Sequence, residues 1–242
     1  MNNKDRLVMG KNCVYEMDEN YANNNVMIVG GTGSGKTTLI QLISRLYDAT
    51  EGSVKVGRRD VREYDLDTLR NAVSVVLQKN LLFSGTIKDN LRWGNPDATD
   101  EEMEEACRLA QADSFIKTFE DGYDTYIEQG GTNVSGGQKQ RAAVARAIIT
   151  QPKLLLADEP TGALDSGSTD ELLRLFAEIN RAGQTILMVT HSVKAASRAG
   201  RVLFIKDGQV SPQLSRGEDS DTRFYQRISD TLTMLQSGGE QE

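Results

Sequence analysis

The sequence predicts an α/β protein in which helices flank a mostly parallel sheet. Short apolar runs of strand length occur at 26–29, 154–157 and 185–190, and each run leads directly into glycine or polar residues. Segments with helical spacing of apolar residues lie between these runs. Strands that alternate with helices are typical of parallel sheets, because a parallel connection needs a crossover segment.

Composition restricts the class of protein. The chain has 242 residues, of which 38% are hydrophobic and 26% charged, as in an ordinary soluble globular protein. No apolar run approaches the ~18 residues of a membrane span, and the first 30 residues show no signal-peptide pattern. The net charge of −7 and the lack of a Lys/Arg run argue against nucleic acid as a partner. We expect a cytoplasmic protein whose Cys13 and Cys107 are reduced thiols.

The run at 26–29 enters a glycine-rich segment that predicts a phosphate-binding loop. The segment reads Gly30, Gly31, Thr32, Gly33, Ser34, Gly35, Lys36, Thr37, Thr38. Its glycines let backbone N–H groups point inward around an anion, and Lys36 supplies a charge for the β and γ phosphates. The Thr37 hydroxyl is a candidate Mg²⁺ ligand. The alternative is a glycine-rich turn that only joins a strand to a helix.

A helix should begin near Lys36. Apolar residues recur there at helical spacing, namely Leu39, Leu42, Ile43 and Leu46. The positive N-terminus of this helix would face the bound phosphates.

The second run, 154–157, ends in two carboxylates, Asp158 and Glu159. Ligands collect at the carboxyl ends of strands in such sheets, so Asp158 is expected beside the phosphate loop as a Mg²⁺ ligand. Glu159 is then placed to polarise the attacking water. The alternative is a helix start, since acidic residues followed by Pro160 also suit a first helical turn.

His191 is the only histidine and follows the third run. A lone histidine is often structural, but an imidazole at a strand end can donate a hydrogen bond to a γ phosphate. We therefore include His191 among the catalytic candidates, with Glu159.

In its motifs the chain resembles the nucleotide-binding domain of ATP-binding-cassette (ABC) transporters. Six motifs in the family's order carry the resemblance: the phosphate loop at 30–37, a switch glutamine at Gln78, the signature Ser135, Gly136, Gly137 and Gln138, the acidic strand at 154–159, the segment 163–165, and His191. Val134 stands where the family's signature commonly opens with leucine. The resemblance implies a P-loop NTPase fold with an inserted helical subdomain.

The resemblance also implies a mechanism. Two copies would pack head to tail, each ATP lying between one copy's phosphate loop and the signature residues 135–138 of the other. Ser135 is a natural N-cap for the helix through 140–147, whose positive end would face the opposing γ phosphate. Gln78 would reach Mg²⁺ or the attacking water, and the segment after it would couple to an integral-membrane permease. The protein would then sit on the inner face of the cell membrane.

Other functions remain open. A nucleotide-binding module could dimerise with weak or no hydrolysis. A DNA-repair or chromosome ATPase would share the six motifs, but those proteins insert a long coiled coil, and no heptad run lies between Lys36 and Asp158. The transported substrate and the direction of transport cannot be predicted, because specificity would reside in the permease.

We expect one domain over 1–242, with a core at about 1–85 and 150–215 and the helical subdomain at about 86–149. Within it, a helix should cover about 100–119, with Met103, Ala106, Cys107 and Ala110 on one side. A capping box at 168–171 should open a later helix that runs to Gly183. A C-terminal helix is expected at about 219–236. Residues 128–133 resemble the cross-linking loop of exporters, or form a solvated turn.

The resemblance changes along the chain. Residues 72–152 resemble the ATPase of exporters, residues 155–242 the stand-alone ATPases of peptide-antibiotic and lipoprotein-release transporters, and residues 23–36 the coupling ATPases of type IV secretion. A divergent natural protein and a recombined or computed sequence are both compatible with this, and we favour the second. The antiparallel strands before the loop are expected to be reduced. Tyr15 or Tyr21 would stack on adenine, and losing that stacking would cost about 1–3 kcal/mol.

Overall fold

The structure is a computed structural model and describes residues 6–8, 14–16, 25–30, 35–57, 59–206 and 209–237. These residues fall into two compact units, which we describe separately. Unit 1 comprises residues 1–70 and 185–242, and unit 2 comprises residues 71–184.

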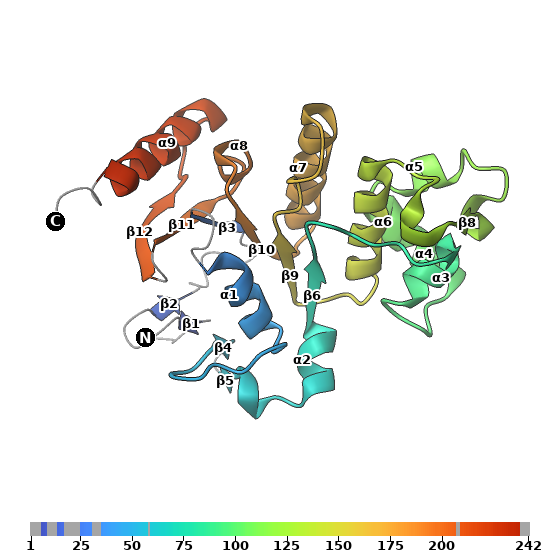
Figure 1. Cartoon of the computed structure of the whole chain (residues 1–242), viewed down its shortest axis with the longest axis horizontal. Coiled ribbons are helices and arrows are strands. Elements are labelled where there is room, and N and C mark those ends of the chain that lie inside the picture. The colour runs from blue at the N-terminus through green and yellow to red at the C-terminus, as the bar shows by residue number, and fades with distance from the viewer. Residues whose placement is uncertain are drawn as a thin grey trace. The chain divides into compact units, whose positions relative to one another are not determined.

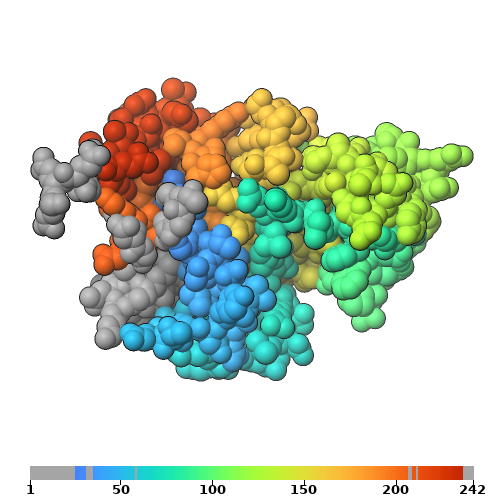
Figure 2. All heavy atoms as spheres, in the orientation of Figure 1, coloured from blue at the N-terminus to red at the C-terminus, as the bar shows by residue number. Residues whose placement is uncertain are grey.

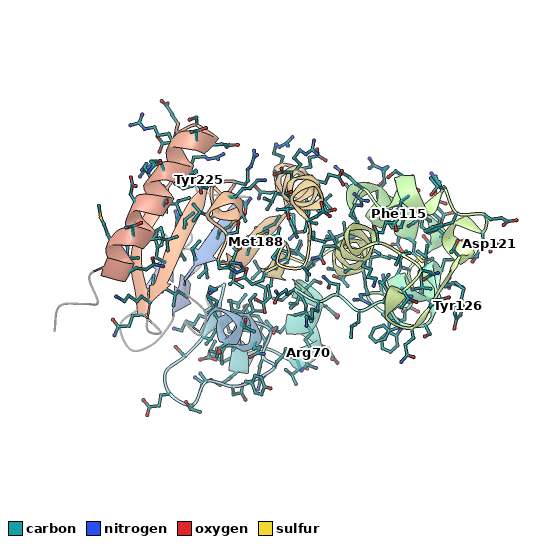
Figure 3. The ribbon with its side chains drawn as sticks, turned by 45° about the horizontal axis from the view of Figure 1, so that its top comes forward. Arg70, Phe115, Asp121, Tyr126, Met188 and Tyr225 are labelled. Atoms are coloured by element: carbon teal, nitrogen blue, oxygen red, sulfur yellow. The ribbon has the colours of Figure 1, made fainter. Side chains whose placement is uncertain are left out.

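Parallel strands form the centre of unit 1. β3 (Asn25–Val29) pairs in parallel with both β10 (Thr185–Thr190) and β11 (Arg201–Lys206), and β12 (Gln209–Ser215) pairs antiparallel with β11. All five residues of β3 are buried, as expected of a strand covered on both faces. Met188 of β10 lies among these strands and is fully buried (Figure 3).

Three helices cover the strands of unit 1. α1 (Lys36–Ile43) contacts β10, while α8 (Val193–Ala196) and α9 (Asp221–Ser237) lie on the other side of the strands (Figure 1). α9 confirms the predicted C-terminal helix, and its own side chains Phe224 and Ile228 are fully buried. Arg198 and Arg216 form ion pairs with Asp221 at its first turn.

Helix α1 begins at the predicted residue but ends earlier than its apolar stripe. Leu46, the fourth member of that stripe, is 59% exposed, so its expected place on the buried face is wrong. The cause lies in the backbone. Ser44 caps the helix and Arg45 adopts a left-handed conformation with φ 51°, which turns the chain away before Leu46.

Short elements complete unit 1. β1 (Arg6–Val8) pairs antiparallel with β2 (Val14–Glu16). The expected reduction of the N-terminal strands stays a prediction, because the residues on both sides of these strands lie outside the described ones. β4 (Lys55–Val56) pairs antiparallel with β5 (Arg59–Asp60), and a 3₁₀ turn, η2 (Val61–Glu63), follows. The chain then passes through α2 (Leu66–Ala72) into unit 2.

Unit 2 contains a second parallel pair of strands. β6 (Val73–Val76) pairs with β9 (Leu154–Asp158), and Val76 lies opposite Ala157. α6 (Gly136–Ile148) packs on β6 and also contacts α7 (Ser166–Arg181). β9 therefore confirms the strand at 154–157, and no helix begins at Asp158 or Glu159.

The helices of unit 2 are capped by side chains. α3 (Ile87–Arg92) and α4 (Asp100–Leu109) each begin with a complete capping box, supplied by Thr86 with Asp89 and by Thr99 with Glu102. The shorter elements are β7 (Gly85–Thr86), α5 (Asp113–Ile116), η3 (Gly122–Asp124), β8 (Tyr126–Ile127) and η4 (Gln129–Gly131). The last of these lies in the glycine-rich segment at 128–133.

The helix expected over 100–119 is divided into α4 and α5, because Gln111 between them has a left-handed backbone with φ 51°. Its predicted buried side is confirmed, since Met103, Ala106, Cys107 and Ala110 are all buried. Burial raises the pKa of the Cys107 thiol to about 12, so it stays protonated and unreactive. Cys13 lies outside the described residues.

The predicted start of α7 is wrong. The helix begins at Ser166, and its cap lies three residues before Ser168, the first residue of the expected capping box at 168–171. Asp165 is the N-cap, and its carboxylate accepts hydrogen bonds from the Ser168 backbone N–H and hydroxyl. These bonds lower the pKa of Asp165. An aspartate caps as well as a serine does, so the competing signal lay just upstream.

The observed elements confirm an α/β protein with a mostly parallel sheet. The expected boundaries of the core and the helical subdomain, near residues 85 and 149, remain a prediction.

A close backbone contact in unit 2 yields a stability prediction. A Cβ at Gly94 would lie 2.2 Å from the Arg146 carbonyl oxygen and 2.8 Å from Ile149 Cγ2. We expect Gly94→Ala to lower the free energy of unfolding by about 1–3 kcal/mol, because a rigid helix backbone must shift. Denaturant unfolding measures this. Gly200→Ala is the control, since its Cβ would meet only the Asn25 oxygen at 3.8 Å. Equal stability of the two variants would contradict the prediction.

Candidate functional site

In unit 1, one side chain joins the two ends of the predicted phosphate loop. Gly30 directly follows β3, and Lys36 is the first residue of α1. The Lys36 side chain is buried, and its Nζ donates a 2.6 Å hydrogen bond to the Gly30 carbonyl oxygen. Residues 31–34, which include Gly31, Thr32, Gly33 and Ser34, lie outside the described residues. The lysine ammonium is thus held against Gly30, the residue that follows β3.

The start of α1 suits an anion. Gly35 is its N-cap, with φ 90°, and has no side chain to satisfy the first N–H groups of the helix. A Cβ at Gly35 would meet nothing within 4 Å, so the left-handed backbone, and not crowding, favours glycine there. Thr37 and Thr38 in the first turn are exposed, and α1 reaches the surface on the face in Figure 2.

His191 lies at the same edge of the unit 1 strands as Gly30. In the parallel register Val29 is opposite Thr190, so the residues after each strand emerge side by side. The turn after Thr190 is held by its own side chains. The Thr190 hydroxyl accepts from the Ser192 backbone, and the Ser192 hydroxyl caps α8. His191 itself is exposed.

Unit 2 brings Gln78, Asp158 and Glu159 to a common edge. Val76 is opposite Ala157, so Gln78 follows β6 where Asp158 ends β9. Asp158 is buried, and Glu159 has a left-handed backbone with φ 45°. This unusual conformation turns the chain directly after the strand. A Cβ at Gly162 would lie 2.6 Å from Gln78 Nε2, so the Gln78 amide reaches the segment that follows the two carboxylates.

The signature residues form the start of α6. Ser135 is the N-cap, its hydroxyl accepting from the Gln138 N–H while the Gln138 side chain accepts from the Ser135 N–H. The N-cap role of Ser135 is confirmed, and the reciprocal role of Gln138 was missed, although the serine–glutamine spacing signals it. Cβ atoms at Gly136 and Gly137 would lie 3.6 Å from Leu164 and 3.4 Å from Ser168, so segment 163–165 is adjacent.

Each unit carries groups of the kind that bind a nucleotide triphosphate with a divalent cation. In unit 1, Lys36 and the uncapped start of α1 suit phosphate oxygens, and Thr37 offers a hydroxyl oxygen. In unit 2, Asp158 offers a carboxylate, which is an oxygen ligand that Mg²⁺ prefers. In the described part of the chain no three Cys, His, Asp or Glu side chains gather into a metal site. A cation held mainly by phosphates and water needs no such cluster. For adenine, the Tyr15 side chain and all of Tyr21 lie outside what the structure describes.

Sequence reasoning missed a set of side chains that fasten the loop after Gln78. Asn80 bonds to Gln140, Phe83 is held through its backbone by Asn90, and Arg146 donates to the Leu81 carbonyl. No pattern in the sequence signals bonds of this kind, since their partners are 7 to 65 residues apart.

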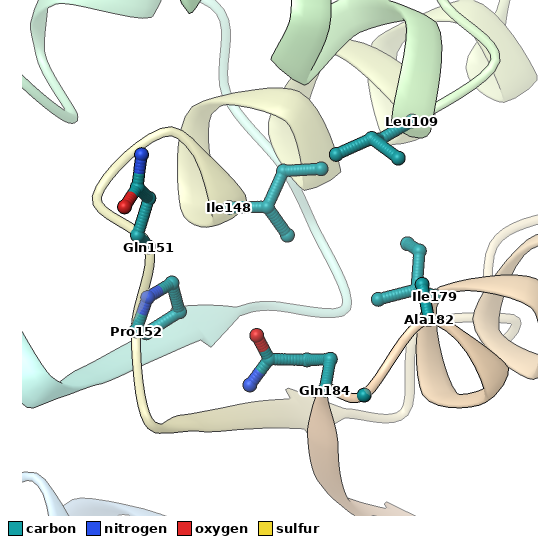
Figure 4. A pocket seen from close by; sticks show the side chains of 8 residues that line it. Leu109, Ile148, Gln151, Pro152, Ile179, Ala182 and Gln184 are labelled. Atoms are coloured by element: carbon teal, nitrogen blue, oxygen red, sulfur yellow. The ribbon is translucent and has the colours of Figure 1, made fainter.

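One cavity of about 320 Å³ lies apart from these residues. It opens where α4, α6 and α7 end, and Figure 4 shows its lining: Leu109, Ile148, Gln151, Pro152, Ile179, Ala182, Gly183 and Gln184. None of the predicted site residues lines it.

Comparison with known proteins agrees with these features. The ABC transporter family model matches residues 19–162. P-glycoprotein 14 of Caenorhabditis elegans is 40% identical over 205 residues, which cover 85% of this chain and 15% of that protein. The mitochondrial potassium channel ATP-binding subunit of Xenopus tropicalis is 42% identical over 187 residues, covering 77% and 27%.

Similarity extends to a bacterial Atm1-family ABC exporter solved with ATP bound. The TM-score is 0.74 and the identity 29%, covering 93% of this chain and 41% of that one. The chain therefore spans well under half the length of the relatives it matches. Within the described residues no helix is long and apolar enough to span a membrane.

The family model covers more than half of the chain, and the structural match covers nearly all of it. Together with a lysine fixed at a phosphate loop and a capped signature helix, these matches show that the chain belongs to the ABC transporter family, as a nucleotide-binding domain of the P-loop ATPase type.

Proposed function

We propose that the chain binds and hydrolyses Mg-ATP at a head-to-tail dimer interface and drives transport by an exporter-type membrane permease. One observation carries the dimer. Gly136 and Gly137 are exposed or half-buried and lie on ordinary helical backbone, and added Cβ atoms would make only normal contacts. Nothing in the described part of this chain requires glycine at either position. Their small size is explained if a phosphate held by a second copy approaches this helix start closely.

ATP would be held first by its phosphates. The Lys36 ammonium would exchange its Gly30 partner for, or share it with, phosphate oxygens, and the N–H groups that start α1 would donate to them. Bound Mg²⁺ would neutralise charge on the phosphates, with Thr37, Asp158 and Gln78 as its protein ligands. Tyr15 remains the proposed stacking partner of adenine.

Hydrolysis needs a polarised water and a stabilised γ phosphate. Glu159 would accept a proton from the attacking water, and Gln78 would help to orient that water. His191 would donate a hydrogen bond to the γ phosphate, which gains negative charge in the transition state. Loss of the γ phosphate would remove the anion that joins the two copies, and the dimer would open.

A rigid apolar surface in unit 2 supports a permease as the partner. Phe83 and Trp93 stack with ring centroids 4.7 Å apart, yet are 44% and 68% exposed. Leu77 and Leu81, in the same loop as Phe83, are also more than half exposed. Two hydrogen bonds fix the Phe83 backbone, because its N–H donates to Asn90 Oδ1 and its carbonyl oxygen accepts from Asn90 Nδ2. The exposed Phe83 ring is therefore held in a defined position. Exposed apolar clusters of this kind mark protein contacts. The proposed location is therefore the cytoplasmic face of a membrane.

The role of Glu159 is tested by Glu159→Gln. Without a base for the attacking water we expect steady-state phosphate release to fall at least about 10²-fold. ATP binding should persist, so the variant should accumulate as a dimer in Mg-ATP, measured by light scattering after size exclusion. The wild-type chain with and without nucleotide is the control. An unchanged turnover rate would show that another residue activates the water.

The glycine argument is tested by Gly137→Ala. Alanine is the better helix former, so the isolated chain should be as stable as wild type or up to about 0.5–1 kcal/mol more stable. The added methyl group should nevertheless block the approach of the partner's phosphate. Combined with Glu159→Gln, it should therefore reduce the dimer fraction in Mg-ATP at least about tenfold. A fully retained dimer would place the second ATP contact elsewhere.

A further inference from the structure

The loop that follows Gln78 is tied to α6 by a hydrogen bond between two amide side chains. Asn80 Nδ2 donates to Gln140 Oε1 at 2.7 Å. The same Asn80 amide also donates to the Leu77 carbonyl oxygen. Both hydrogens of the Asn80 NH₂ group are thus used, one by the Gln140 oxygen and one by the Leu77 oxygen. Because Leu77 and Asn80 bracket Gln78, this bond fixes the Gln78 segment to the helix.

Gln140 is an unusual residue for a helix interior. It is only 4% exposed, and its Nε2 has no hydrogen-bond partner. A buried donor without a partner is costly, so such groups are few in folded proteins and need an explanation. The one bond that the Gln140 amide makes in the structure is the one to Asn80, which gives a reason for a polar side chain at this position.

Arg146 provides a second attachment further along α6. Its Nη1 donates to the Leu81 carbonyl oxygen at 3.2 Å, and its guanidinium lies 5.6 Å from the centre of the Phe83 ring. Burial lowers the pKa of this guanidinium, which still remains charged at any physiological pH. The loop therefore follows α6 at two points, and rotation of that helix displaces Gln78.

We propose that the Asn80–Gln140 hydrogen bond couples the two ATP sites of the dimer. The inference rests on the proposed head-to-tail dimer, in which Gln78 serves the ATP of its own phosphate loop while Ser135 to Gln138 serve the ATP of the partner. Gln140 is two residues beyond Gln138 on the same helix, and Asn80 is two residues beyond Gln78. One bond inside one chain thus connects the groups that contact different nucleotides.

The physical basis is the stiffness of the connecting parts. When ATP of one site closes on the start of α6, the helix moves as a rigid rod and carries Gln140 with it. Asn80 and Leu77 follow, which brings Gln78 toward the other site. Closure of the first site thereby lowers the cost of ordering the second, which is a coupling free energy between two binding sites. Gln140 is a positioning residue, since it contacts neither nucleotide.

Gln140→Leu tests this link. Leucine has a similar volume and removes the unpaired donor, so the fold should be retained. We expect the Hill coefficient for ATP in steady-state phosphate release to fall from near 2 toward about 1. Asn80→Leu should have the same effect. The double variant should be no worse than either single variant, because both remove one bond.

Gln140→Glu is the rescue variant. Its carboxylate keeps an acceptor for the Asn80 amide, so cooperativity should persist even though a buried carboxylate lowers stability. Thermal unfolding of each variant separates the two effects. Gln184→Leu is the matched control, a glutamine of the same unit whose side chain lines the cavity in Figure 4, and its Hill coefficient should equal that of wild type.

The outcomes separate the two proposals. If Glu159→Gln forms no dimer in Mg-ATP, the proposed function fails and this inference fails with it. If that dimer forms and Gln140→Leu keeps the wild-type Hill coefficient, or if wild type shows no cooperativity, this inference alone is overturned. If the Hill coefficient falls equally in Gln140→Leu, Gln140→Glu and Gln184→Leu, the effect follows instability and the link is again rejected.

Discussion

Parallel strand pairing is the constraint on which the placement of every candidate residue depends. In a parallel pair both carboxyl ends lie at the same edge of the sheet. Residues that follow the two strands therefore lie close together, although they are far apart in sequence. In unit 1 the pairing of β3 with β10 brings His191 beside the end of the phosphate loop. In unit 2 the pairing of β6 with β9 brings Gln78 beside Asp158 and Glu159. The flanking helices then supply the backbone N–H groups of their N-termini. The start of α1 has no side-chain cap, and the start of α6 has a capping box.

The two helix starts use opposite solutions to the same problem. The first N–H groups of a helix need acceptors. At α6 the Ser135–Gln138 capping box supplies them internally, so this start is ordered before any ligand arrives. At α1 the N-cap is Gly35, which offers no side chain, and the buried Lys36 adds a positive charge. A bound phosphate would satisfy both groups at α1, so under the proposed function the loop before α1 is the primary anion site and the start of α6 the secondary one.

Much of this arrangement could be predicted from the sequence, because it follows from short-range patterns. The apolar runs predicted three strands whose ends are correct within one residue, and the glycine–lysine segment predicted the start of α1. The pattern failed where a single residue departs from regular backbone. Arg45 and Gln111, both at φ 51°, end helices that the apolar spacing would have continued. The start of α7 was misplaced because Asp165 and Ser168 are both good caps, and only packing decides between them.

Long-range amide pairs were not predictable at all, and they carry the connection between the motifs. Asn80 and Gln140 have no periodicity that relates them, yet their bond is one of the two that join the loop to the helix. The unpaired Gln140 Nε2 costs about 1–3 kcal/mol, which a leucine at the same place would avoid. A motif scan detects the groups that touch the nucleotide. The side chains proposed to couple those contacts are found only when each buried polar atom is checked for a hydrogen-bond partner.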